Sequence, residues 1–575
     1  MREKRWMSRV ALISIWLLMT VQSYCQDAQW LRQSTLNPKD PADRPHIVML
    51  FADDWGRYAS AYAALQGGTV SDAVQTPNFD KIAADGLLFT HAFVSAPSCT
   101  PCRSALMSGQ PFWRCDRASI LRGAIWEGTE PAYPIALQES GYRIGHTYKV
   151  WSPGSPANEP HGGKATSFNK AGSKFNRFSQ FVSDAGDDKI EEAKQTLYSE
   201  VRKNVRAFMD ADNDGELDGD KPICYFFGPT NCHRKWIAGS GKRLWGIDPD
   251  SLKGKLPPYL PDVATVRQDF ADYLGEAQAF DAGVGVILEE LDRLGIADNT
   301  IVVVSGDHGI PGVTRGKCNL YDAGTHVPLA IRWPQGIQKP GRVIDDLVSL
   351  PDLAVTFLHA ASVRPPDDMI ARSLVEVFES EDSGRVVVER DAAYTGRERH
   401  VDMARPDGLP YPQRAIRTAD YLFIINFEPD RWPMGDGPGY GRSGGMPLTD
   451  SFSVKLRENT QVAFADMDAS PTKSWVVMHR QQDPESFQYA VGKLPKYELF
   501  NVKKDPHCMQ NLAGSREHQQ TFEKLKLRLM NYLHETGDPR VGDNPIFEDA
   551  PYTTMTPKGV KERSQYSGES SFREE

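Results

Sequence analysis

Short apolar runs alternate with longer amphipathic stretches over residues 44–395. The runs are apolar at successive positions, as in strands buried on both faces of a sheet; they are His46–Ala52, Lys221–Phe227, Thr300–Ser305 and Val386–Val388. The stretches have the apolar spacing of helices; they are Asn78–Leu88, Arg103–Ser108 and Ala271–Leu294. Strands that alternate with helices predict an α/β fold, with a mostly parallel central sheet flanked by helices.

The pattern changes near residue 395. Residues 414–427 predict a hairpin around Thr418-Ala-Asp420, and residues 517–533 predict a terminal helix. We therefore expect a large α/β domain over residues 44–395 and a smaller α+β domain over residues 396–547. Residues 548–575 are polar and predict a flexible tail.

The first 25 residues have the pattern of a cleaved signal peptide. Basic residues precede an uncharged, mostly apolar run over Val10–Val21, and small residues precede Gln26. The alternatives are a membrane anchor, for which the run is shorter than the roughly 20 residues of a span, and lipid attachment at Cys25. We expect an exported protein, periplasmic or secreted, without a stable membrane span.

Overall composition excludes one class of function. The formal net charge of -10 argues against a broad nucleic-acid-binding surface, although it leaves room for a local basic pocket. Eight cysteines are scattered along the chain, and their spacing specifies no disulfide framework.

Acidic residues follow two of the predicted strands. Asp53-Asp54 comes directly after the first strand, and Asp307-His308 follows the strand that begins at Thr300. Ligands bind at the carboxyl ends of strands in open α/β sheets. Adjacent acids in such a place often cap a helix or form a solvated turn, but three carboxylates from two strand ends also suit Ca²⁺.

The most specific stretch is Cys99-Thr-Pro-Cys-Arg103, followed by Ser-Ala-Leu-Met-Ser-Gly109. A structural or disulfide-bonded cysteine is the simplest explanation of Cys99 taken alone. A nearby cation would lower the pKa of its thiol and make it reactive. Pro101 restricts the backbone before a helix start, where free amides attract anions.

This stretch resembles the C-x-P-x-R signature of formylglycine-dependent sulfatases, which share the alkaline phosphatase-like fold. The resemblance implies that a maturation enzyme oxidises Cys99 to formylglycine, whose hydrate attacks sulfur, and that Arg103 stabilises it. It also implies one Ca²⁺ held by Asp53, Asp54, Asp307, His308 and the modified Cys99. Cys102 departs from the usual Ser or Ala and adds a second thiol that could pair.

The same resemblance assigns further catalytic roles. Lys149 and Lys317 are similar to the lysines that grip sulfate, and His233 is similar to a histidine that protonates the leaving group. Trp151 stands where many sulfatases have a histidine, so the proton donor is left open between His233 and the nearby His146 and His161. Cationic and aromatic loop residues are candidates for sugar contacts; they are Arg234, Trp236, Trp245, Arg399, Arg414 and Trp432.

Within the family, the chain is most similar to the sulfamidase, or heparan N-sulfatase, branch. Segments that carry this likeness include Gly309-Ile-Pro311, Asn319-Leu-Tyr321 and Tyr497-Glu-Leu-Phe500. The expected activity is removal of sulfate from a sulfated saccharide, as in N-sulfoglucosamine sulfohydrolases. The alternatives are an O-sulfatase of algal or host polysaccharides, a phosphonate or phosphate monoester hydrolase, and a glycan-binding protein with a dead site.

A separate acidic loop runs from Asp210 to Asp220. Asp210, Asp212, Asp214 and Asp218 match the first part of a calcium-binding loop. Lys221 stands where such a loop has its bidentate glutamate, so an acidic surface turn is an equally open interpretation.

Overall fold

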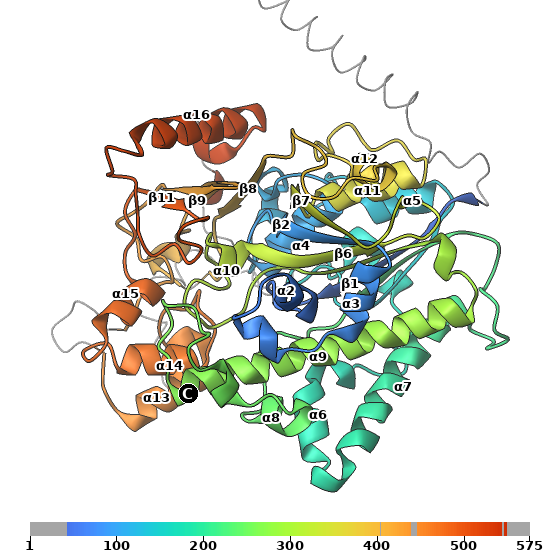
Figure 1. Cartoon of the computed structure of the whole chain (residues 1–575), viewed down its shortest axis with the longest axis horizontal. Coiled ribbons are helices and arrows are strands. Elements are labelled where there is room, and N and C mark those ends of the chain that lie inside the picture. Colours follow the sequence, from blue (N-terminus) through green and yellow to red (C-terminus); the bar gives the residue numbers. More distant parts are fainter. Residues whose placement is uncertain (1–42, 403, 439–445, 543–545, 549–575) are drawn as a thin grey trace, which may run out of the picture.

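The computed structural model describes residues 43–402, 404–438, 446–542 and 546–548. A seven-stranded sheet forms its centre, in the order β3-β4-β1-β5-β6-β2-β7 (Figure 1). Its strands are β1 (His46–Ala52), β2 (Leu87–Phe93), β3 (Arg143–Tyr148), β4 (Ile223–Gly228), β5 (Thr300–Gly306), β6 (His326–Arg332) and β7 (Arg342–Ser349). Neighbours pair in parallel except where β6 joins β5 and β2, so the predicted mostly parallel α/β fold is confirmed.

The register of β1 determines where the functional residues emerge. β1 lies between β4 and β5, and Ala52 is paired with Gly306 at the ends of the two strands. The residues that follow, Asp53 and Asp307, therefore leave the sheet side by side. Six of the seven side chains of β1 are buried, as expected for a strand covered on both faces.

Helices cover both faces of the sheet (Figure 1). One apolar core contains residues of α3, α6, α7 and α9, and the other contains residues of α4, α5, α11 and α12. The helices of this part are α2 (Ser60–Leu65), α3 (Pro77–Ala84), α4 (Cys99–Ser108), α5 (Tyr133–Glu139), α6 (Phe178–Asp184), α7 (Ile190–Met209), α8 (Ser240–Trp245), α9 (Ala264–Arg293), α10 (Asp322–Thr325), α11 (Asp352–Ala360) and α12 (Val375–Glu379).

A second, antiparallel sheet has the order β11-β10-β9-β8. Its strands are β8 (Ala392–Arg397), β9 (Gln413–Thr418), β10 (Tyr421–Asn426) and β11 (Tyr497–Asn501). The remaining helices are α13 (Asp450–Glu458), α14 (Pro471–Met478), α15 (Pro484–Val491) and α16 (Gln519–Glu535). The hairpin and the terminal helix predicted for this region are both present, and β8 spans residue 396, where the smaller domain was expected to begin.

One predicted element is too long and another is wrong. The helix expected over residues 78–88 is present as α3 but ends at Ala84, and Leu87 and Leu88 belong to β2. Gly86, between the two elements, lies against the backbone of β6: a Cβ there would be 2.1 Å from the Ile331 carbonyl oxygen. Residues 386–388 form no strand. The amides of Val386 and Val387 donate to the Asp346 carboxylate instead, and Val388 is 74% exposed.

Among the described residues, no helix combines the length and the apolar character that crossing a bilayer requires. The seven cysteines of the described part are free thiols, so Cys102 has no disulfide partner there. The predicted signal peptide over residues 1–25 lies outside the described residues, as does nearly all of the predicted tail.

Candidate active site

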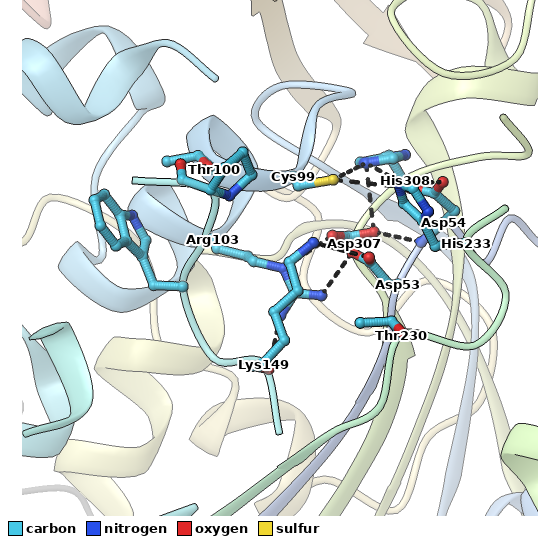
Figure 2. A network of polar contacts seen from close by, with 12 residues as sticks. Asp53, Asp54, Cys99, Thr100, Arg103, Lys149, Thr230, His233, Asp307 and His308 are labelled. Carbon is cyan, nitrogen blue, oxygen red and sulfur yellow. Dashed lines mark hydrogen bonds and ion pairs between the residues drawn. The ribbon is translucent and has the colours of Figure 1, made fainter. Parts of the chain in front are cut away.

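Three aspartates converge at the carboxyl edge of the central sheet (Figure 2). Asp53 and Asp54 follow β1, and Asp307 follows β5. The Asp54 amide donates to Oδ1 of Asp307 at 2.8 Å, and Asp54 adopts a left-handed φ of 62°. All three carboxylates are at most 1% exposed. Parallel pairing of neighbouring strands thus brings together acids that are more than 250 residues apart.

Cys99 is the first residue of α4 and faces these aspartates (Figure 2). Its Sγ lies 3.4 Å from Nε2 of His308 and 3.8 Å from Oδ1 of Asp54, and the residue is 2% exposed. Burial raises the pKa of the thiol well above its usual value, and the negative charge of Asp53 raises it further. The expectation that a neighbouring cation makes Cys99 a reactive thiolate is therefore wrong for the unmodified residue.

Arg103 lies one helical turn after Cys99 on the same face of α4. Its Nε donates to Asp307 at 2.9 Å and its Nη2 donates to Asp53 at 3.1 Å. Nη1 donates to the carbonyl oxygens of Lys149 and Val150. The side chain is fully buried, so the guanidinium is a fixed positive charge between two carboxylates.

Two lysines complete the charge pairing. Lys149, directly after β3, donates to both carboxylate oxygens of Asp53, at 2.6 and 2.8 Å. Lys317 donates to both oxygens of Asp54, at 3.0 and 3.2 Å. Burial alone would raise the pKa of Asp53, but Lys149 and Arg103 hold it well below its usual range. Arg103, Lys149 and Lys317 therefore match the three carboxylates of Asp53, Asp54 and Asp307 in number.

Two histidines border the cluster. Nε2 of His308 lies 3.2 Å from Oδ1 of Asp54, and this ring is fully buried. His233, after β4, places Nε2 4.0 Å from Oδ2 of Asp54, and its side chain is 38% exposed. Nδ1 of His233 lies 2.5 Å from the Arg234 carbonyl oxygen, which can only accept. Nδ1 therefore carries a proton, and Nε2 faces the site.

The cluster has the donors of a metal site. Ligand atoms of Asp53, Cys99 and Asp307 lie within 4.8 Å of one another, and so do those of Asp54, Cys99 and His308. The two sets share Cys99 and together offer three carboxylates. This donor chemistry fits a hard cation, with one nitrogen ligand as the softer member.

His146 and His161, the other two candidates for the proton donor, lie away from the cluster. His146 contacts Asn158 and Thr166, and its ring packs edge-on against that of His161. Trp151 is fully buried and donates from Nε1 to Ser104 of α4. Trp151 thus supports the helix that carries Cys99, and of the three histidines weighed as proton donors only His233 borders the carboxylates.

Two residues of the site were missed from the sequence. His400 is 4% exposed, and its Nδ1 lies 2.8 Å from Oγ of Ser98, the residue before α4. Asp468 places Oδ2 3.6 Å from Nζ of Lys317. Both come from the part of the chain after β8, and no motif or spacing relates them to Cys99.

Several other predicted residues are engaged elsewhere. Arg234 forms a bidentate pair with Asp269, and Arg414 is fully buried between Asp538 and Glu398, so neither guanidinium is free to bind a sugar. A cavity of about 460 Å³ is lined by residues that include Arg57, Tyr259 and Asp322 but none of the predicted catalytic residues.

In the acidic loop, ligand atoms of Asp210, Asp212 and Asp218 lie within 4.8 Å of one another, while Asp214 is not in this group. Arg293 donates to Asp210 at 2.5 Å, so a cation of the protein already balances that carboxylate. A second calcium site therefore stays a prediction.

Comparison with protein-family models matches residues 45–363 to the family described as Sulfatase. Residues 312–436 match the family described as N-sulphoglucosamine sulphohydrolase, C-terminal. The first match spans more than half of the chain.

Individual relatives align over most of their length. Human N-sulphoglucosamine sulphohydrolase is 24% identical over 528 residues, covering 86% of this chain and 91% of that protein. An ulvan-active sulfatase of Formosa agariphila is 22% identical over 522 residues, covering 86% of this chain and 76% of that protein. The crystal structure of a phosphonate monoester hydrolase of Agrobacterium radiobacter has a TM-score of 0.56 at 17% identity, covering 90% of this chain and 99% of that chain. This last likeness shows the fold alone.

Proposed function

The chain belongs to the sulfatase family and is a sulfate-ester or sulfamate hydrolase; from this premise we propose that it removes sulfate from a saccharide, with N-sulfoglucosamine as the first candidate. The observation that carries the proposal is the convergence of Cys99 and Arg103 with the three aspartates. The N-sulfated substrate is favoured by the relatedness to the human sulfohydrolase and by the C-terminal family match.

We propose that Asp53, Asp54, Asp307 and His308 hold a calcium ion beside residue 99. The carboxylate donors fit this ion. Arg103, Lys149 and Lys317 already balance the charges of Asp53, Asp54 and Asp307, so the bound ion would add positive charge to the cluster. A positive cluster is complementary to a sulfate group.

The nucleophile in this proposal derives from Cys99. Formylglycine at this position would supply, as its hydrate, the oxygen that attacks sulfur. The raised pKa of the unmodified thiol argues against a cysteine thiolate as the nucleophile in this site. Since Cys99 is 2% exposed, a maturation enzyme has to reach it before the chain has folded.

The chain's own cations and His233 handle the sulfate and the leaving group. Lys149 pairs with Asp53 and Lys317 pairs with Asp54, so both ammonium groups are at the site, where they can neutralise sulfate oxygens. Arg103, locked by two carboxylates, keeps residue 99 in place. Because Nδ1 of His233 is bonded to a carbonyl, Nε2 can donate a proton to the leaving group only from the imidazolium form.

A substrate screen tests the proposal. The purified protein is incubated with N-sulfated and O-sulfated glucosamine oligosaccharides, with ulvan oligosaccharides and with an aryl monoester of a phosphonate, and released sulfate or phenol is measured. We expect the wild-type protein to release sulfate from the N-sulfated substrates and the Cys99→Ala variant to release none. Mass spectrometry of the peptide that contains residue 99 checks for the thiol-to-aldehyde conversion.

Each competing reading has its own outcome. Turnover of only the O-sulfated or ulvan substrates would identify an O-sulfatase, and faster turnover of the phosphonate would identify a phosphonate hydrolase. Binding of a saccharide without release of sulfate, together with unmodified Cys99, would identify a glycan-binding protein. We also propose export through residues 1–25, which N-terminal sequencing of the mature protein tests.

A further inference from the structure

A fourth carboxylate lies at the edge of the catalytic cluster. Asp468 belongs to the segment between η12 (Thr460–Val462) and α14, far along the chain from the strands that carry the other acids. Its Oδ2 lies 3.6 Å from Nζ of Lys317, which also donates to Asp54. The side chain is 18% exposed, so Asp468 borders both the proposed sulfate site and solvent.

One oxygen of the Asp468 carboxylate accepts no hydrogen bond from the described residues, although it is buried beside Lys317. No hydrogen-bond donor in the described part of the chain reaches its buried Oδ2. Asp466, two residues earlier, differs in this respect because it accepts from Arg397, Arg405 and the Val401 amide. The ion pair with Lys317 balances the charge of Asp468, but Oδ2 keeps an acceptor position that no hydrogen-bond donor of the described residues fills, so it can accept from a ligand.

The segment that carries Asp468 is nevertheless held firmly. Lys473, fully buried, donates to the carbonyl oxygens of Thr460, Phe464 and Met467. Oγ of Ser470 donates to the Gly312 carbonyl at 2.6 Å. Gly312 has a φ of 71°, and a Cβ there would lie 2.9 Å from the Asp468 carbonyl oxygen. The fold therefore fixes Asp468 against the loop that carries Lys317.

The chemistry of a carboxylate indicates what it binds. Sulfate oxygens carry no hydrogen, so Asp468 repels the sulfate group, whereas sugar hydroxyls and the N–H of a sulfamate can donate to it. We propose that Asp468 is a specificity residue that accepts a hydrogen bond from the sugar group next to the reacting sulfate. The same charge disfavours sugars that carry a second sulfate or a carboxylate at that neighbouring position.

The inference rests on the proposed function, and two kinetic constants test it. In Asp468→Ala, the KM for the saccharide substrate should rise by about tenfold or more, as expected for losing a hydrogen bond to a charged group. The inhibition constant for inorganic sulfate should fall by roughly threefold, because a negative charge near the anion site is gone. Asp468→Asn keeps one acceptor and should show a smaller rise in KM with the same change in sulfate inhibition.

A KM that rises while the inhibition constant for sulfate falls distinguishes loss of substrate recognition from damage to the structure of the site. A distorted site would bind saccharide and sulfate more weakly together, and that result, or an unchanged KM, would overturn the inference. Asp367→Asn is the matched control, because Asp367 is 87% exposed in a surface ion pair with Arg364 and should leave both constants unchanged. A wild-type protein that releases no sulfate from any saccharide is a separate result, which overturns the proposed function and this inference with it.

Discussion

Replacing Asp466 by Asn should destabilise the protein strongly. Its carboxylate accepts from Arg397 at 2.6 Å, from Arg405 at 2.7 Å and from the Val401 amide at 3.1 Å. None of the three ionic side chains is more than 3% exposed. The substitution keeps the shape and leaves two buried guanidinium groups without a counter-charge, for which we expect a loss of about 3–5 kcal/mol in the free energy of unfolding.

The pH dependence gives a second magnitude. Burial would raise the pKa of Asp466, but Arg405 and Arg397 outweigh it and lower the pKa from 3.8 to about 2. Because the folded-state pKa is the lower one, this group contributes stability above the unfolded value and loses it as the pH falls towards about 2. The full contribution is about 2–3 kcal/mol, of which about 1 kcal/mol should already be lost at pH 3.

Urea titration of both proteins at pH 7, 5 and 3 measures these effects. The gap between wild type and Asp466→Asn should be constant from pH 7 to 5 and smaller by about 1 kcal/mol at pH 3. Asp367→Asn, in an exposed pair, should stay within about 0.5 kcal/mol of wild type. A gap below about 1 kcal/mol at pH 7, or one that widens in acid, would refute the reasoning.

Three further outcomes follow from the same structure. Arg103→Lys cannot reproduce the fork that joins Asp53 to Asp307, so kcat should fall by about 100-fold or more; a kcat near that of wild type would contradict this role. Gly312→Ala should lower the melting temperature and raise the KM, because its Cβ would lie 2.8 Å from Cβ of Ser470. An unchanged melting temperature and KM would show that the loop around Gly312 can move to accommodate the methyl group. Removing calcium with EGTA should abolish activity and lower the melting temperature. Added Ca²⁺ should restore both, and added Mg²⁺ should restore neither; full activity in EGTA would show that catalysis does not need calcium.

The sequence predicts those parts of the site that follow directly from strands. β1 and β5 are continuous apolar runs, their acids come one residue later, and parallel pairing leaves almost no freedom in where those acids meet. The C-x-P-x-R stretch predicts a helix that starts only after Pro101. α4 instead begins at Cys99, and this earlier start places Cys99 and Arg103 four residues apart on one face of the helix.

Tertiary contacts determine the parts that the sequence does not predict. Asp468 reaches Lys317 because Lys473 and Ser470 fix its segment, and neither contact has a local signature. Val386 and Val387 have strong β propensity, yet the Asp346 carboxylate competes successfully for their amides. Propensity describes what a segment prefers on its own, and here a distant acid overrides it.

The pairing of Asp53, Asp54 and Asp307 with Arg103, Lys149 and Lys317 has a consequence for handling the protein. A metal centre built from carboxylates alone would leave the apoprotein with strong internal repulsion, and folding would then depend on the ion. Here each acid already has a basic neighbour in the same chain. We therefore expect the apoprotein to fold and to survive purification in chelators, so that different divalent ions can be added back to one preparation and compared.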